Sequence, residues 1–267
     1  MDLKTLKDTP PWDWPEGMDQ RLIDVLADAR VDESERILAA ELAGEFAVIN
    51  DELANALLAI LLNDDEPEEL RAAAVISLGP AIDYVDTYEF EDPDEMPITE
   101  QTFQKIQESL RKLYMRDDLP KDVKRRILEA SVRAPQDWHE DAIRAAFSRN
   151  DNDWILTAVF SMRWISGFDA EIVEALESED EDVYYQAVCA AGNWEIDEAW
   201  PHVSRLVTST DTEKSLLLAA IDAAAGIRPQ EAGLILAGLN DSDDEDIVEA
   251  VNEAMAMAEE LLDEESE

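Results

Sequence analysis

Two distant stretches of the chain carry the same pattern of residues. Residues 64–79 read DDEPEELRAAAVISLG, and residues 177–192 read ESEDEDVYYQAVCAAG. Each stretch passes from an acidic turn through an apolar residue, Leu70 or Val183, to a glycine nine residues later. Aligned apolar residues recur roughly every 30 positions, at Leu38, Leu70, Val123, Trp154, Val183, Leu217 and Ile247. Such a period is typical of repeat architectures, and it constrains the fold more than any other feature of the sequence.

Each repeat has the features of a pair of helices. An apolar or alanine residue stands four positions after every aligned residue, which places both on one helical face. Three pairs resemble capping boxes at the starts of second helices: Ser178 with Glu181, Thr210 with Glu213, and Ser242 with Glu245. We expect Gly79, Gly192 and Gly226 to end those helices in the left-handed conformation.

A helical hairpin with apolar residues on more than one side cannot cover itself, so neighbouring hairpins must stack. The sequence therefore predicts an all-α fold, an α-solenoid of about seven stacked helical hairpins over residues 19–262. Residues 1–18 are expected to form an N-terminal cap, with Trp12 and Trp14 covering the open end. An insertion loop is expected at about 83–100, and an acidic tail at 263–267.

The repeat resembles the HEAT-repeat family, in particular short bacterial repeats of the kind also found in phycobilin lyases. The residues that carry this resemblance are Asp64, Asp65, Pro67, Leu70, Arg71, Ala72, Ala73, Ala74, Leu78 and Gly79. The resemblance implies the solenoid fold and specifies function weakly. Di-iron hydroxylases of this type use several His-Glu pairs, and here only His139-Glu140 is present. HEAT-like DNA glycosylases need a basic surface, which this chain lacks.

The net charge of −44 is the most unusual quantity in the composition. A surface this negative repels nucleic acids and anionic membranes, so neither is an expected partner. The charge suits either adaptation to a salty cytoplasm or attraction of a basic protein or peptide. No apolar signal-peptide core and no apolar run long enough to span a bilayer occurs in the sequence, so a cytoplasmic location is expected.

The sequence offers little for catalysis. His139 and His202 are the only histidines, and each suits a capping or surface position. Cys189 stands at a phase expected to be buried as a small apolar residue. The acidic run at 241–246 lacks the glycine and the trailing glutamate of a calcium loop. We expect no catalytic residues, no cofactor and no metal site.

Candidate partner-binding residues lie where the sequence departs from the repeat. The insertion contributes Tyr84, Tyr88 and Phe90, among many carboxylates. The central repeats contribute Arg163, Trp164, Tyr184, Tyr185 and Trp194. Aromatic residues with an arginine are typical of interface hot spots, and the alternative interpretation is thick packing between repeats.

The function predicted from these features is a non-enzymatic adaptor or scaffold that presents an acidic surface to a basic protein or peptide. Two alternatives remain open. One is an accessory or lyase-like factor that holds a small prosthetic group, and the other is a chaperone for basic client proteins. The sequence does not indicate which face binds, which partner is bound or whether the chain forms oligomers.

Overall fold

The computed structural model describes residues 2–90, 92 and 95–264. The chain forms two compact units. The first unit extends to residue 139 and the second begins at residue 140. Within the described residues every regular element is a helix. The last three residues of the predicted acidic tail, 265–267, lie outside the described part.

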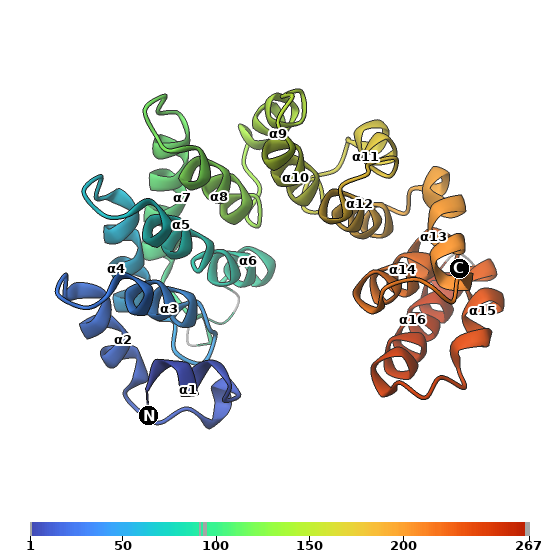
Figure 1. Cartoon of the computed structure of the whole chain (residues 1–267), viewed down its shortest axis with the longest axis horizontal. Helices are drawn as coiled ribbons and strands as arrows, with labels where there is room; N and C mark the ends of the chain where they lie inside the picture. The colour runs from blue at the N-terminus through green and yellow to red at the C-terminus, as the bar shows by residue number, and fades with distance from the viewer. Residues whose placement is uncertain (1, 91, 93–94, 265–267) are drawn as a thin grey trace. The chain divides into compact units, whose positions relative to one another are not determined.

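The first unit contains three helical hairpins in series (Figure 1). Its elements are α1 (Leu3–Lys7), η1 (Pro11–Asp13), α2 (Met18–Ala27), α3 (Glu33–Ala43), α4 (Asp51–Leu62), α5 (Glu68–Ile76), α6 (Gly79–Tyr88), α7 (Glu100–Tyr114) and α8 (Lys121–Ser131). The second helices α3, α5 and α8 pack on one another in that order, and the first helices α2, α4 and α7 do the same. The core lies between these two layers, around Leu22, Leu57, Leu70 and Ile106.

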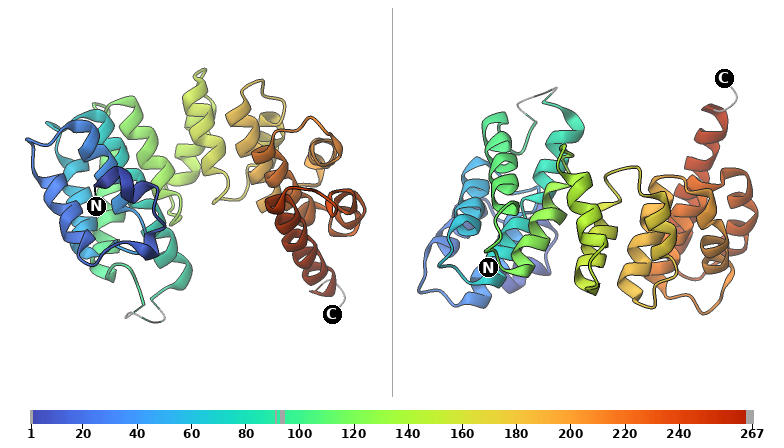
Figure 2. Two further views of the ribbon diagram at one scale, coloured as in Figure 1. Left: turned by 60° about the horizontal axis from the view of Figure 1, so that its bottom comes forward. Right: turned by 90° about the horizontal axis from the view of Figure 1, so that it is seen from above.

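The second unit repeats this plan (Figures 1 and 2). Its elements are α9 (His139–Phe147), α10 (Asn152–Ser161), α11 (Asp169–Ala175), α12 (Glu181–Asn193), η2 (Asp197–Ala199), α13 (Trp200–Thr208), α14 (Lys214–Ile227), α15 (Pro229–Leu236), η3 (Ala237–Leu239) and α16 (Glu245–Glu264). Helices α10, α12, α14 and α16 pack successively. The predicted all-α fold of stacked hairpins is therefore confirmed within each unit, and the described residues form seven consecutive helix pairs.

Buried arginines link the second helix of a hairpin to the end of the first. Arg36 donates to the carbonyl of Leu26 at 2.8 Å, and Arg71 donates to the carbonyl of Leu61 at 3.0 Å. Both bonds span ten residues, so Arg36 and Arg71 occupy equivalent positions. This equivalence corrects the alignment of the first repeat, which was placed on Leu38. The position that matches Leu70 is Glu35, which is exposed.

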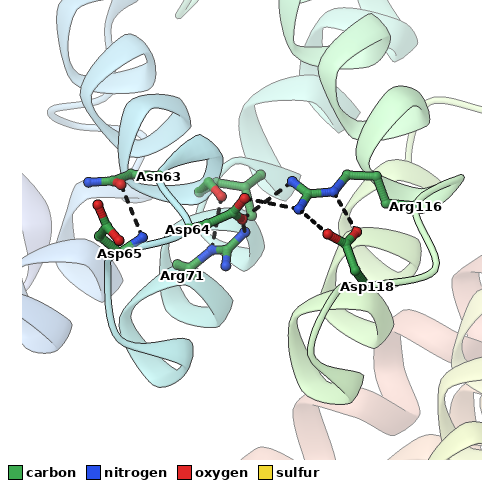
Figure 3. A network of polar contacts seen from close by, with 7 residues as sticks. Asn63, Asp64, Asp65, Arg71, Arg116 and Asp118 are labelled. Carbon is green, nitrogen blue, oxygen red and sulfur yellow. Dashed lines mark hydrogen bonds and ion pairs between the residues drawn. The ribbon is translucent and has the colours of Figure 1, made fainter.

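Asp64, the partner of Arg71, joins the second hairpin to the third (Figure 3). The guanidinium of Arg71 pairs with the carboxylate of Asp64 at 2.8 Å, and Arg116 binds the other oxygen of that carboxylate at 2.9 Å. Arg116 pairs in turn with Asp118 at 2.9 Å. In the third hairpin Lys124 donates to the carbonyl of Arg116 at 2.7 Å, the role that Arg71 has in the second. A cation next to the buried anchor thus caps the end of the preceding helix in successive hairpins.

The repeated glycines do not end helices in the left-handed conformation, and that prediction is wrong. Positive φ angles among the described glycines occur only at Gly17 and Gly167. Gly192 lies inside α12, where an added Cβ would stand 2.7 Å from the Cα of Ala223 in α14. An added Cβ at Gly226 would stand 2.9 Å from the carbonyl oxygen of Gly192. These glycines are required because the backbones of consecutive second helices approach closely.

The close approach predicts opposite effects for two glycine-to-alanine substitutions. Gly192→Ala is expected to lower the free energy of unfolding of the second unit by about 2 kcal/mol, because the neighbour is backbone and must shift. Gly233→Ala, in α15 with open space around the added Cβ, is expected to raise it by about 0.5 kcal/mol through helix propensity. Urea denaturation of both variants checks the pair. A stabilising Gly192→Ala would contradict the packing.

The helix starts lie close to their predicted positions, but other residues cap them. The side chain of Asp180 accepts from the amides of Asp182 and Val183 at the start of α12. Glu213 does the same for Ser215 and Leu216 in α14. The predicted capping serine, Ser178, instead accepts from the amide of Asp180 at 3.1 Å. The capping boxes are wrong because a carboxylate two or three residues beyond each predicted cap accepts from the free amides instead.

The ends of the predicted insertion and the amino terminus also differ from expectation. The insertion is helical up to Tyr88, since α6 covers its first residues, and residues 91, 93 and 94 lie outside the described part. At the amino terminus the buried residues are Leu3 and Leu6 of α1. Trp12 is 80% exposed, so the prediction that it covers the open end is wrong. Trp14 is half-buried, and its indole donates to the carbonyl of Thr9 at 2.9 Å.

Candidate partner-binding groove

The second unit carries a groove of about 750 Å³ beside the first turns of α12 and α14. We call it the tyrosine groove. Its lining residues are Glu181, Asp182, Tyr184, Tyr185, Gln186, Leu206, Ser209, Asp211, Thr212, Glu213, Ser215 and Leu216. Two of the predicted partner-binding residues, Tyr184 and Tyr185, therefore lie in one groove, next to residues that the sequence analysis did not single out.

The repeat itself explains why the tyrosines lie in this groove. The cap at Asp180 fixes the start of α12, and the anchor Val183 points into the core and is 2% exposed. The two residues after this anchor are both half-buried, whereas Arg71, which follows the anchor Leu70, is buried. Two large, rigid aromatic side chains are thus held at the surface of a helix whose other side is fixed by packing.

Tyr184 turns toward the helix α13. Its ring centroid lies 6.3 Å from that of His202, whose Nε2 is 3.2 Å from the carboxylate of Glu177. The Tyr184 hydroxyl and the His202 Nδ1 are both buried, and neither has a hydrogen-bond partner among the described residues. A buried polar atom without a partner is unfavourable, so the contact between Tyr184 and α13 carries an energetic cost.

Tyr185 belongs to a different group of side chains, around Arg163. Cys189 and burial raise the pKa of the Tyr185 phenol, and the two side chains share a hydrogen bond. Burial also raises the pKa of the Cys189 thiol, which is half-buried on the face of α12. The prediction of a core position for Cys189 is therefore wrong. Asp222 on α14 is accessible to solvent but surrounded by protein, and this desolvation raises the pKa of its carboxyl.

Arg163 is the cation that opposes these shifts. It lowers the pKa of Tyr185, Cys189 and Asp222, each against the larger effect named above. Its guanidinium donates to the side chain of Gln186 at 3.2 Å. It also lies 5.2 Å from the ring centroid of Trp164. Arg163 is thus held between α10 and α12 and ties the tyrosine groove to the preceding hairpin.

Trp164 and Trp194 have a packing role in this arrangement. The indole of Trp194 donates to the carbonyl of Met162 at 2.6 Å, across the interface of two hairpins. The ring of Trp164 packs on Phe160 with centroids 4.7 Å apart. Both indoles are half-buried and hold the end of α10 against α12. The structure therefore brings Arg163, Trp164, Tyr185 and Trp194 into one neighbourhood, and only the tyrosines line the groove.

The lining of the tyrosine groove is negatively charged. Four carboxylates line it, and its lining residues include no lysine or arginine, although Arg163 contacts the lining residue Gln186. Glu213 is engaged as the cap of α14, whereas Glu181, Asp182 and Asp211 make no ion pair with any described residue. Acidic residues like these three occur at helix starts throughout the sequence, where they resemble ordinary caps. Their contribution to a groove was therefore not visible from the sequence.

A second groove, of about 840 Å³, lies in the first unit along α3, α5 and α8. Carboxylates from Glu33, Glu41, Glu68 and Glu69 surround a floor that includes Ala72 and Ala73. Arg125 and Arg126 also line it, and Arg125 pairs with Asp122 at 3.2 Å. Its own cations reduce the negative potential, and it has no aromatic anchor. The tyrosine groove is therefore the better candidate for a basic partner.

The remaining candidates lie in the first unit. Phe90 packs edge-to-face on Phe103 at 5.9 Å between centroids, a contact that holds the end of the insertion on α7. The ring of Tyr84 packs in a tilted arrangement against those of Phe46 and Tyr88. The sequence analysis missed Phe46 because it follows the end of α3 in a short turn. The three predicted residues of the insertion therefore divide between a packing contact and a stack of aromatic rings.

The described residues contain neither a metal-binding cluster nor a helix that could span a membrane. No group of three or more histidine, cysteine, aspartate and glutamate side chains is arranged to hold a metal ion there. No described helix combines the length and the apolar character needed to cross a bilayer. His139 is fully buried, accepts from the amide of Gln136 at 2.9 Å, and lies 3.0 Å from the hydroxyl of Ser131. Burial lowers the pKa of His139 to about 3.

Comparisons with known proteins give likenesses to solved structures at low identity. No family model matches the sequence, and no curated protein matches it. The X-ray structure of YibA of E. coli has a TM-score of 0.48 and 16% identity over 92% of this chain and 84% of that chain. Human deoxyhypusine hydroxylase in complex with glycerol has a TM-score of 0.42 and 14% identity, over 97% of this chain and 88% of that one. An engineered protein has a TM-score of 0.37 and 16% identity, over 91% and 97%.

Proposed function

We propose that the protein is a non-catalytic scaffold that binds a basic segment of another protein in the tyrosine groove. The observation that carries this proposal is the lining of the groove, which combines four carboxylates and two tyrosines and includes no lysine or arginine. The negative potential attracts a cationic segment, and the tyrosines provide the contacts that hold it.

The dimensions of the groove support a peptide-like ligand. A volume of about 750 Å³ is within the range of sites that hold several side chains of a bound segment. Leu206 and Leu216 give the floor an apolar part, where the methylene stem of a lysine or an arginine fits. The side chain of Tyr184 lines one side of the groove. Charge therefore attracts the segment, and the floor and Tyr184 fix its register.

The proposal predicts that removing the groove charge weakens binding of basic peptides. In a triple variant with Glu181→Gln, Asp182→Asn and Asp211→Asn, the affinity for a lysine- and arginine-rich peptide is expected to fall about tenfold in dilute buffer. The shape of the groove is kept, because each amide is isosteric with the carboxyl it replaces. Fluorescence anisotropy of a labelled peptide measures the change. The difference between the variant and the wild type is expected to shrink in molar salt.

A matched control separates the groove from the charge of the whole chain. The control carries Asp65→Asn, Asp117→Asn and Glu198→Gln, three exposed carboxylates outside both grooves, and it loses the same net charge. Its affinity is expected to stay within about twofold of the wild type, because distant exposed charges are screened. Equal losses in the two triple variants would contradict a specific groove. If the chain bound basic proteins only when those client proteins were unfolded, the chaperone alternative would instead be favoured.

A further inference from the structure

Three aromatic rings stack in series on the first unit. The ring of Phe46 lies 4.5 Å from that of Tyr84, and Tyr84 lies 4.4 Å from Tyr88, centroid to centroid. The two tyrosines stand one turn apart on α6, and Phe46 follows the end of α3. We call these three residues the aromatic ladder. It is separate from the tyrosine groove, which belongs to the second unit.

The two outer rings of the ladder are exposed to solvent. Phe46 is 49% exposed and Tyr88 is 48% exposed, which places both among the most exposed large hydrophobic side chains of the described residues. The opposite side of α6 is fixed in the core by Ala81, Ile82 and Val85. The ladder is thus held in place by packing, while its own faces are left uncovered. A rigid, uncovered group of aromatic rings is typical of a binding surface.

Carboxylates on the same helix determine the charge of a suitable ligand. Asp83 pairs with Arg133 at 3.4 Å, whereas Asp86 and Glu89 make no ion pair with a described residue. Burial, and then the charges of Asp83 and Glu89, raise the pKa of the Asp86 carboxyl. These carboxylates repel one another, and a bound cation relieves that repulsion. The ladder therefore combines exposed rings with an excess of negative charge.

Contacts elsewhere in the chain show how cations pack on such rings. Arg149 lies 4.3 Å from the ring centroid of Trp154, Arg144 lies 4.7 Å from that of Phe168, and Lys124 lies 5.2 Å from that of Tyr114. A guanidinium is planar and weakly hydrated, so it stacks on an aromatic face while its edges still donate hydrogen bonds. An ammonium group is strongly hydrated and makes this contact less readily. Exposed rings beside unpaired carboxylates therefore favour arginine over lysine.

We propose that the aromatic ladder binds arginine side chains of a basic segment, with guanidinium groups stacked on Phe46 and Tyr88 and attracted by the unpaired carboxylates of Asp86 and Glu89 on α6. The proposal rests on the proposed function in one respect, that the partner is basic. It adds a second surface and a preference for arginine. The two surfaces are tested separately because they lie in different units.

The experiment compares two peptides of equal charge, hexa-arginine and hexa-lysine, on the full chain at one ionic strength. The wild type is expected to bind hexa-arginine about fivefold more tightly than hexa-lysine. A double variant with Phe46→Leu and Tyr88→Leu keeps apolar bulk but removes the ring faces. It is expected to lose the preference while its affinity for hexa-lysine stays unchanged. Met115→Ala, at another exposed apolar residue of the first unit, is the control and is expected to keep the preference.

Each outcome distinguishes this proposal from the proposed function. An arginine preference that persists in the double variant overturns the ladder as its source. The tyrosine-groove triple variant is expected to bind both peptides more weakly while keeping the arginine preference. If that triple variant binds normally and the ladder variant loses the preference, the ladder stands and the groove is overturned. If neither peptide binds the wild type, both proposals are overturned.

Discussion

Acidification is expected to destabilise the first unit through His139. In the folded chain burial lowers the pKa of His139 to about 3, whereas an unfolded histidine titrates near about 6.5. Between these two values the unfolded state binds more protons than the folded state, so acid favours unfolding. The contribution of neutral His139 is fully present above about pH 6.5 and is lost as the pH falls toward about 3. The loss amounts to about 1.4 kcal/mol per pH unit within that range.

The environment of the ring explains why protonation is so unfavourable. Nδ1 of His139 accepts from the amide of Gln136, and Nε2 lies beside the hydroxyl of Ser131. The ring centroid also lies 3.9 Å from that of Trp138. A proton on Nδ1 would remove the acceptor for the Gln136 amide and place a charge in a fully buried site. No carboxylate pairs with His139 among the described residues to offset that charge.

The measurement is the difference in unfolding free energy between the wild type and His139→Asn at several pH values from 7 to 4. Taking the difference cancels the titration of the carboxylates, which both proteins share. Asparagine keeps an acceptor for the Gln136 amide and does not titrate, so the advantage of the wild type is expected to shrink steadily as the pH falls. His202→Asn serves as the control and should keep the pH dependence. The same difference at pH 7 and pH 4 would contradict the assignment.

The repeat made the fold predictable because it determines which residues are buried. The anchors Leu70, Val123 and Val183 are all buried, and each starts the apolar face of a second helix. The starts of the second helices could be predicted within a few residues for the same reason. The roles of the glycines were not predictable, because a left-handed helix end and a close helix contact both require glycine. Only the position of Ala223 beside Gly192 separates the two.

The candidate site was predictable in part. Tyr184 and Tyr185 were predictable as bulky aromatic residues directly after an anchor, although Arg71 at the equivalent position of another repeat is buried. Asp211 was missed because an acidic residue before a helix has the pattern of a cap whether or not it lines a groove. Phe46 was missed because its partner Tyr84 is distant in the sequence. Tyr84 belongs to α6, a helix that interrupts the repeat. Contacts between residues outside the repeat carry no periodic signal.

Replacing Arg71 with methionine is expected to lower the free energy of unfolding of the first unit by about 3 kcal/mol. Arg71 is 3% exposed and donates both to the carbonyl of Leu61 and to the carboxylate of Asp64. Methionine keeps the aliphatic packing but leaves the buried carbonyl without its donor. Arg30→Met is the control, because Arg30 is 90% exposed and its pair with Asp28 is open to solvent. The control should leave the urea midpoint unchanged.

The same substitution at Arg36 tests the corrected register of the first repeat. If Arg36 and Arg71 are equivalent, Arg36→Met removes a donor from the carbonyl of Leu26 and from the carboxylate of Glu66, and the loss of stability should match that of Arg71→Met within about 1 kcal/mol. An alignment on Leu38 gives Arg36 no such role, since it would then stand outside the repeated positions. A much smaller effect at Arg36 would mean that the first hairpin does not use the arginine cap. Equal effects would show that one physical contact, a buried cation on the end of the preceding helix, sets the spacing of successive hairpins.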